Sequence, residues 1–140
     1  MLIAEDRSSA KVSPDNLTFH VIEDRRAVRS PWGCGNSKIG PGVYTYSKMP
    51  GIKESCPGAT GVCEAICYAK RALANPFLIE LWAENQDRDE LPPLPSDARL
   101  VRIHVSGDFD SLEYIAEWIE LCSVNSAVNF WGYTRSWRIA

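Results

Sequence analysis

The last third of the chain contains the pattern that most restricts its fold. From Leu100 to Ser106, apolar and polar residues alternate, which predicts a strand with one buried face. A helix is predicted to begin near Asp110, and a second strand runs from Val128 to Thr134. A strand, a helix and a strand over residues 99–136 form a βαβ unit, in which the strands run parallel. We therefore predict an α/β domain, either a partial barrel or an open parallel sheet built from such units.

The helix of this unit has a recognisable start and a predicted buried face. Asp110-Ser111-Leu112-Glu113 has the form of a capping box, with Asp110 placed to accept hydrogen bonds from free N–H groups. Apolar residues then recur at helical spacing and are expected to face the core: Leu112, Ile115, Ala116, Ile119 and Cys122. We therefore interpret Cys122 as a packing residue.

The carboxyl ends of the two strands indicate where a ligand would bind, because ligands of parallel sheets bind beyond those ends. The ends are Ser106-Gly107-Asp108-Phe109 and Tyr133-Thr134-Arg135. If the polar face of the first strand lines a cleft, a substrate or ligand could contact Arg102, His104 and Arg135. The alternative is an ordinary half-exposed strand.

The first half of the chain is less regular. Residues 1–30 read as an irregular N-terminal segment, and residues 31–75 as a cysteine-containing, Gly/Pro-rich loop followed by a helix. A short β segment is predicted at 43–46, a helix from Gly61 to about Ala74, and another from Phe77 to about Arg88. We expect residues 1–140 to form a single domain, with the loop over the carboxyl edge of the sheet.

Three of the five cysteines lie within twelve residues. Cys63 and Cys67 are four residues apart on the predicted helix, so their side chains would share one face, and Cys56 lies in the loop before it. Thiolates favour zinc, copper(I) or iron–sulfur clusters. The fourth ligand could be Cys34, a histidine or an exogenous group. The alternative is that Cys63 and Cys67 simply pack in the core.

Composition narrows the class of protein further. The formal net charge is −3, which gives no general attraction to nucleic acid, and no apolar run approaches the ~20 residues of a membrane span. The first ten residues, MLIAEDRSSA, do not form a secretory signal. An odd, clustered set of cysteines without such a signal favours metal or redox chemistry over disulfides. We expect a cytoplasmic protein without membrane contact.

Several motifs together resemble a known family. They are Asn36-Ser37-Lys38, Cys56-Pro57-Gly58-Ala59, Cys67-Tyr68-Ala69, Arg102–Phe109 and Phe130–Arg135. Their combination, over about residues 32–138, resembles the bacteriophage family named for mycobacteriophage gene product 88. The resemblance implies a phage-encoded protein that acts in the host cytoplasm, but it implies no biochemical role.

A looser similarity concerns chemistry. Three cysteines before a strand that ends in a small residue, glycine and an acid are similar to the radical S-adenosylmethionine (SAM) enzymes. That similarity implies a [4Fe–4S] cluster on Cys56, Cys63 and Cys67, with SAM bound through its amino group at Ser106, Gly107 and Asp108. The spacing differs, because this chain has C-x6-C-x3-C instead of C-x3-C-x2-C. The chain also offers too few strands for the partial barrel of those enzymes, so we expect a truncated or split version.

Two functional hypotheses follow from the sequence. The first is an iron–sulfur, radical SAM-like protein with an unknown substrate. The second is a non-enzymatic module in which Zn²⁺ orders the cysteine loop so that the domain binds nucleic acid or protein. A cluster of Trp131, Tyr133 and Trp137 beside Arg135 and Arg138 is compatible with stacked bases and phosphate contacts. The sequence leaves open whether the protein is an enzyme.

Overall fold

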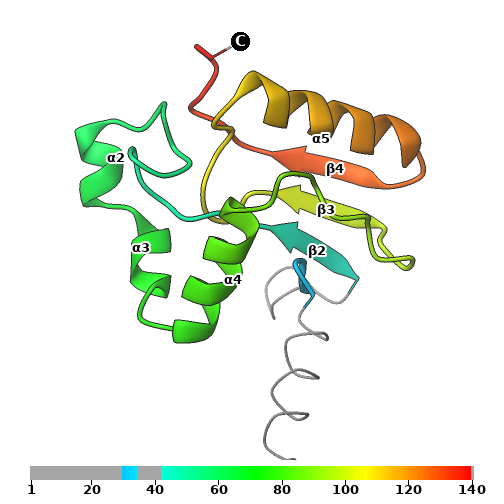
Figure 1. Ribbon diagram of the computed structural model, residues 1–140, viewed down its shortest axis with the longest axis horizontal. Helices are drawn as coiled ribbons and strands as arrows, with labels where there is room; N and C mark the ends of the chain where they lie inside the picture. The colour runs from blue at the N-terminus through cyan, green and yellow to red at the C-terminus, as the bar shows by residue number, and fades with distance from the viewer. Residues whose placement is uncertain (1–29, 35–41, 140) are drawn as a thin grey trace, which may run out of the picture. The chain divides into compact units, whose positions relative to one another are not determined.

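The fold was obtained as a computed structural model, which describes residues 30–34 and 42–139 (Figure 1). The predicted irregular segment 1–30 lies outside the described residues, apart from Ser30, as does the Asn36-Ser37-Lys38 motif. The described residues from Pro31 onward form one compact unit.

Within the described ranges, four strands form one open sheet in the order β1-β2-β3-β4. They are β1 (Gly33–Cys34), β2 (Val43–Tyr46), β3 (Leu100–Ile103) and β4 (Asn129–Gly132). The pairs β2–β3 and β3–β4 are parallel, whereas β1 is antiparallel to β2. The prediction of an α/β fold with an open sheet is confirmed. The sheet is mixed instead of wholly parallel, and its described strands do not close into a barrel.

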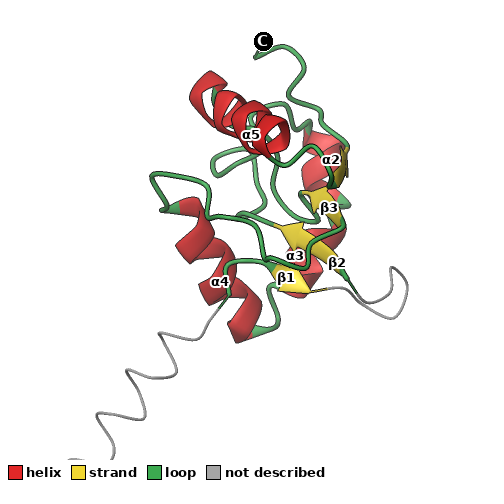
Figure 2. Cartoon of the chain, turned by 90° about the vertical axis from the view of Figure 1, so that its right-hand side faces the viewer, coloured by secondary structure: helices red, strands yellow, loops and turns green. Residues whose placement is uncertain are grey.

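The helices lie on one side of the sheet and beyond its carboxyl edge. They are α2 (Gly61–Ala65), α3 (Tyr68–Ala72), α4 (Pro76–Gln86) and α5 (Leu112–Val124), and α5 connects β3 to β4. The side view of Figure 2 shows α4 and α5 on the same side of the sheet. In Figure 1, α2 and α3 lie beyond the arrowheads of the three parallel strands. The carboxyl ends of the strands therefore face the segment that carries the clustered cysteines.

An aromatic core joins the sheet to α5. The buried residues of this core are Trp32, Tyr46, Val101, Ile103, Tyr114 and Trp118. The ring of Tyr46 lies 5.2 Å from that of Trp32 and 5.8 Å from that of Trp118, and such tilted and edge-on contacts stabilise aromatic pairs. A smaller cluster of Ala69, Leu81 and Trp82 holds α3 against α4. The first core fixes the strands and the second fixes the helix that follows Cys67.

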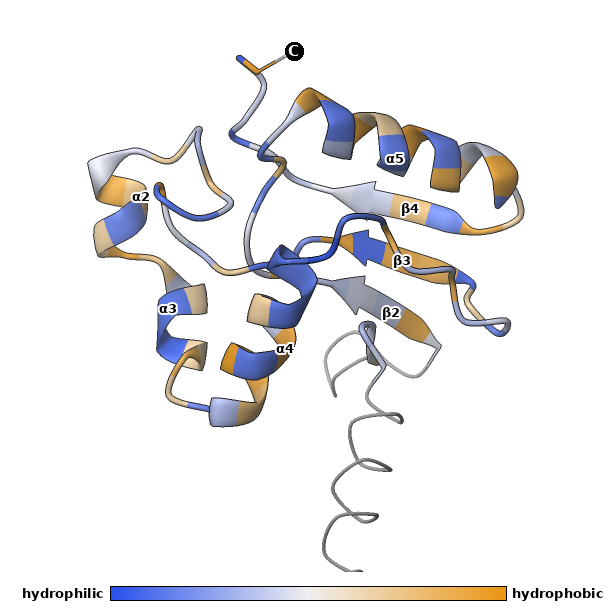
Figure 3. Ribbon diagram, in the orientation of Figure 1, coloured by the Kyte–Doolittle hydropathy of each residue, from blue (hydrophilic) through white to orange (hydrophobic). Residues whose placement is uncertain are grey.

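The predicted start and buried face of α5 require correction. Ser111, not Asp110, caps the helix, because its side chain accepts a hydrogen bond from the N–H of Tyr114. The most buried residues of α5 are Tyr114 and Trp118, whereas Leu112 and Ile119 are 54% and 66% exposed. Figure 3 shows why the pattern misleads, since apolar residues occur all along α5. The large aromatic rings fill the core in place of the aliphatic stripe.

The remaining members of that stripe behave differently from one another. Cys122 packs, partly buried, against the core, so its interpretation as a packing residue is confirmed. Ala116 is exposed and Ile115 is half-buried. The buried face of α5 is therefore rotated away from the predicted one.

The predicted helix from Gly61 to Ala74 is two short helices instead of one. The chain leaves the helical conformation between α2 and α3, where Cys67 has φ −60° and ψ 112°. Helix α3, which begins after this interruption, contacts distant parts of the chain. Ala69 packs on α4, and the Tyr68 hydroxyl donates to the Val105 carbonyl. Cys63 and Cys67 consequently do not share a helix face. The next predicted helix is confirmed as α4, where Asn75 caps the N–H of Phe77.

The first strand of the βαβ pattern is also shorter than predicted. β3 ends at Ile103, and His104 adopts a left-handed backbone conformation with φ 66°, which is uncommon for residues other than glycine. The strict alternation of faces stops there. His104 is therefore buried beside the core, where its ring contacts those of Phe109, Tyr114 and Trp118. The alternation predicted from Leu100 to Ser106 therefore ends at Ile103, and His104 is not part of a regular polar strand face.

Candidate functional site

A pocket of about 480 Å³ lies at the carboxyl edge of the parallel strands. Its volume is within the range of small-molecule sites. The segments that follow β2, β3 and β4 line it together with α2 and α3. All of the predicted site residues contribute to its wall: Cys56, Cys63, Cys67, Arg102, His104, Ser106, Gly107, Asp108 and Arg135. Residues as distant in the sequence as Cys56 and Arg135 thus line the same pocket.

The Asp108 carboxylate joins the ends of β3 and β4. Its Oδ1 accepts hydrogen bonds from the Phe109 N–H at 2.8 Å and the Thr134 hydroxyl at 2.6 Å. Its Oδ2 accepts from the Arg135 N–H at 2.8 Å. Asp108 is only 7% exposed, so these bonds are shielded from water. The carboxylate fixes the backbone from which the Arg135 side chain extends.

A second set of hydrogen bonds joins the segment after β2 to the segment after β3. The Lys48 N–H donates to the Ser106 carbonyl at 2.9 Å, and the Ser106 hydroxyl donates to the Lys48 carbonyl at 3.0 Å. The Asp108 N–H donates to the Ser55 carbonyl at 3.1 Å. The cysteine-containing loop is therefore anchored to the sheet just before Cys56.

Two glycines allow these segments to approach closely. A Cβ on Gly58 would lie 2.2 Å from the Arg135 carbonyl oxygen, so the loop after Cys56 packs directly on the segment that follows β4. A Cβ on Gly107 would lie 2.5 Å from the Ser55 hydroxyl, and Gly107 has φ 84°, a conformation that favours glycine. Three segments distant in sequence are thus in backbone contact around the pocket.

The three clustered thiols line this pocket but do not form a ready metal cage. Burial raises the pKa of the Cys56 thiol, and the nearby Asp108 and Cys67 charges raise it further, against the lowering effect of hydrogen bonds from Gly51 and Ser55. Among residues 30–34 and 42–139, no three His, Cys, Asp or Glu side chains are close enough to hold a metal ion. Cys34 is exposed on β1 and lines a different cavity of about 320 Å³.

His104 combines a buried ring with one free nitrogen. Its Nε2 lies 2.9 Å from the Tyr114 hydroxyl, and its Nδ1 has no hydrogen-bond partner in the described part of the chain. Burial lowers the pKa of His104 to about 4, an effect that the negative charge of Asp108 opposes. The imidazole is therefore neutral at pH 7.

The arginine wall of the pocket consists of Arg102, Tyr133 and Arg135, and the Trp131 ring packs beside it. The Arg102 guanidinium lies 5.0 Å from the centre of the Trp131 ring, and the Tyr133 ring stands edge-on to Trp131 at 5.8 Å. Arg102 Nε is buried and has no hydrogen-bond partner among the described residues. This wall can bind an anion or a planar group.

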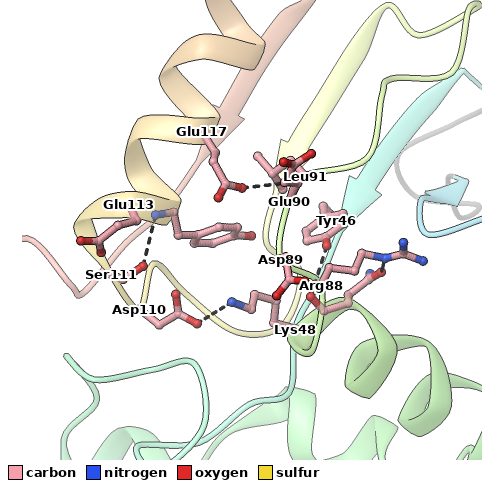
Figure 4. Close-up of a pocket in the computed structure, with 12 residues that line it drawn as sticks. Tyr46, Lys48, Arg88, Asp89, Glu90, Leu91, Asp110, Ser111, Glu113 and Glu117 are labelled. Atoms are coloured by element: carbon pink, nitrogen blue, oxygen red, sulfur yellow. Dashed lines mark hydrogen bonds and ion pairs between the residues drawn. The ribbon is translucent and has the colours of Figure 1, made fainter.

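A second cavity of about 190 Å³ lies between α4 and the start of α5 (Figure 4). Its buried cation, Lys48, pairs with Asp110 at 2.5 Å and lies 4.2 Å from the centre of the Tyr114 ring. The Glu117 carboxylate accepts the Leu91 N–H at 3.1 Å. Because its innermost charged groups are paired with one another, this cavity is a weaker candidate for a binding site.

The sequence interpretation missed several residues that build the first pocket. Lys48 and Ser55 anchor the loop, and Tyr68 contributes to the wall of the pocket. A signal for Lys48 existed, because it follows the predicted β segment at 43–46 and therefore belongs to the same carboxyl edge. No comparable signal marked Ser55 or Tyr68, which depend on the path of the loop.

Comparison with known proteins identifies phage relatives. Residues 75–140 match the family model described as gene product 88. The chain is similar to the gene 88 proteins of Mycobacterium phages L5 and D29, each 33% identical over 123 residues that cover 72% of this chain. These alignments cover 51% and 50% of the relatives, so the chain spans about half their length. No solved structure matches. These matches support the resemblance to phage gene product 88, and none of them supports the resemblance to radical SAM enzymes.

No helix in the described ranges is long and apolar enough to cross a membrane.

Proposed function

We propose that this chain belongs to the phage gene product 88 family and holds a metal centre through the thiolates of Cys56, Cys63 and Cys67. The observation that carries the proposal is the position of these thiols. They come from a loop, from α2 and from the residue before α3, yet all three line one pocket. Such soft donors select iron–sulfur clusters, zinc or copper(I).

Metal binding would require the thiols to move together, because they do not form a cage as they stand. Helix α2, which carries Cys63, is suited to such a movement, because none of its five residues is buried and a helix this short has little stability of its own. Helix α3 is held by the packing of Ala69 on α4, so Cys67 stays near its present place. Metal binding would displace the thiol protons and draw α2 toward Cys56 and Cys67.

An iron–sulfur cluster is the form that best suits the donor set. Three cysteines leave one coordination position for a non-protein ligand, and the pocket provides space beside the thiols. A structural zinc site usually has four protein ligands. When bound, a cluster would supply electron transfer or Lewis acidity at the open position. Free thiolates are best preserved in a reducing compartment, so the proposal assigns the protein to the host cytoplasm.

The residues implied to bind SAM already have structural contacts. Three hydrogen bonds engage both oxygens of the Asp108 carboxylate, and Ser106 is bonded to the segment after β2. An ammonium group would have to share the carboxylate with these donors. We therefore propose the metal centre without a SAM contact at Ser106, Gly107 or Asp108.

The test is metal content after anaerobic purification and reconstitution, by elemental analysis and absorption spectroscopy. We expect iron and sulfide with a brown colour, and we expect Cys56→Ser, Cys63→Ser and Cys67→Ser each to lose most of the metal. Cys122→Ser and Cys34→Ser are the matched controls and should retain it. A colourless protein with stoichiometric zinc would support the same three ligands but identify the metal as zinc. Loss of metal in Cys122→Ser, or its retention in all three variants, would disprove the assignment.

A further inference from the structure

The end of β4 carries a surface that the proposed metal centre does not use. We define the β4-end surface by its residues: Arg102, Trp131, Tyr133, Arg135, Trp137 and Arg138. Arg102, Tyr133 and Arg135 also line the pocket that contains the three thiols. A ligand on this surface would therefore extend toward the thiols.

Large aromatic rings are exposed on this surface. Tyr133 is 79% exposed and Trp137 is 66% exposed, although aromatic rings of this size are usually well buried. Trp131 is held in place between the Tyr133 ring and the Arg102 guanidinium. The Arg138 guanidinium lies 4.6 Å from the centre of the Trp137 ring. Exposed rings with adjacent guanidinium groups favour the stacking of a planar ligand.

The charge of this surface is opposite to that of the whole chain. The chain has a formal net charge of −3, but the β4-end surface contributes three arginines. Asp108 is the one acidic residue among the described residues that line the adjoining pocket, and its oxygens are engaged by hydrogen bonds. The local field therefore attracts an anion despite the overall charge.

Three buried polar atoms in or next to this surface lack partners in the described part of the chain. They are Arg102 Nε, His104 Nδ1 and Ser136 Oγ, and the first two belong to residues that line the pocket. His104 is only 6% exposed, so water does not readily satisfy its nitrogen. Buried polar groups are normally hydrogen-bonded, and a ligand or a water in the pocket would supply the missing partners. The guanidinium N–H in particular needs an acceptor, such as a phosphate oxygen.

The backbone of Arg135 is fixed. Its N–H donates to the Asp108 carboxylate, and its carbonyl is in contact with Gly58. The next residue is also fixed, because the Ser136 N–H donates to the Thr134 hydroxyl at 2.9 Å. A fixed backbone reduces the ordering cost when the Arg135 side chain binds a ligand.

We propose that the β4-end surface binds a nucleotide, with its base stacked on Tyr133 or Trp137 and its phosphate bound by Arg102 and Arg135. This inference extends the proposed function by assigning a ligand class to the same pocket, but it does not require the metal. The nucleotide could be free or part of a single strand, since both offer a planar base and a phosphate. The pocket volume of about 480 Å³ suits a ligand of nucleotide size.

The test measures binding of the full chain to a fluorescein-labelled oligothymidylate of about eight nucleotides, by fluorescence anisotropy. A chelator in the buffer removes metal, so a negative result here is independent of the metal-binding test. Unlabelled thymidine 5′-monophosphate serves as the competitor. We expect Tyr133→Ala to weaken binding about tenfold and Tyr133→Phe to retain it, because phenylalanine keeps the stacking face.

Arg135→Gln provides the test of the phosphate contact. It should weaken binding and reduce the slope of log affinity against log salt concentration by about 0.7. The matched control is Arg99→Gln, which removes an equal charge from an exposed position immediately before β3, at the opposite end of the sheet. That variant should bind like the wild type.

The outcomes separate the sources of the ligand. Competition by the mononucleotide supports a pocket for free nucleotides, whereas strand binding without such competition supports a single strand as the ligand. If Tyr133→Ala loses its fold, as judged by circular dichroism, Trp137→Ala replaces it as the stacking test. The inference is overturned if the wild type binds neither probe, or if Arg99→Gln weakens binding as much as Arg135→Gln.

Discussion

Replacing Asp108 by asparagine should destabilise the fold, because the carboxylate acts as a structural bridge. Both carboxylate oxygens accept hydrogen bonds, from Phe109, Thr134 and Arg135. Asparagine has the same size but offers one carbonyl oxygen and one NH₂ group. Its NH₂ group would face an N–H or O–H donor, so at least one of these bonds is lost and one donor is left without an acceptor.

The size of the effect follows from burial and charge. Asp108 is 7% exposed, and hydrogen bonds to a charged acceptor contribute about 1.5–3 kcal/mol each. Loss of one bond and weakening of the others should lower the free energy of unfolding by about 3 kcal/mol. For a unit of about one hundred residues this corresponds to a fall in Tm of roughly 10–20 °C.

The assay is urea denaturation followed by tryptophan fluorescence, with Thr134→Val and the double variant measured in parallel. Thr134→Val should cost about 1 kcal/mol, and its effect should be smaller in the Asp108→Asn background because the two residues share a bond. Asp89→Asn, at an exposed position, is the control and should stay within about 0.5 kcal/mol of the wild type. A stability of Asp108→Asn within that same range would refute the bridge and return Asp108 to the candidates for ligand binding.

Two further predictions concern His104 and Gly58. Because the pKa of His104 is lowered to about 4 in the fold, the unfolded chain takes up a proton first as the pH falls below 6.5. His104 should therefore remove about 2 kcal/mol of stability between pH 7 and pH 5, and urea denaturation of His104→Gln in chelator should lack this component. Gly58→Ala should cost about 1–3 kcal/mol and reduce metal content, because its Cβ would overlap the Arg135 carbonyl. Gly61→Ala, whose Cβ would meet no atom within 4 Å, should match the wild type in a thermal shift and metal assay.

The sequence was sufficient to predict two parallel strands of an open sheet and the residues around their carboxyl ends. Alternation at Val101 and Ile103 reflects burial of one face, and both side chains are buried. The carboxyl ends of parallel strands meet at one edge, so Asp108 and Arg135 could be placed together without knowledge of any contact. Their hydrogen bond is a consequence of that geometry. This part succeeded because it depends on local periodicity and general topology.

The errors arose where contacts distant in sequence decide local conformation. Helical spacing suggested one face for Cys63 and Cys67, but packing of Ala69 on α4 accompanies a break at Cys67. The positive φ of His104 interrupts a regular alternation that its sequence does not reveal. On α5, hydropathy ranked Ile119 above Tyr114, whereas the space beside the sheet is filled by aromatic rings. Propensity and periodicity do not contain this information.

One wall of the pocket is fixed by backbone contacts, whereas the other must move to bind a metal. This difference bears on both the metal and the nucleotide proposals. The arginine wall extends from segments fixed by the Asp108 bridge and by the close approach of Gly58 to Arg135. The wall that carries the three thiols includes the short helix α2, which must move if Cys56, Cys63 and Cys67 are to share a metal. A nucleotide bound by the fixed wall would therefore find its site whether or not metal is present. Metal binding, in contrast, would order the wall that carries the thiols. The metal should therefore change the contacts of the bound nucleotide more than its affinity.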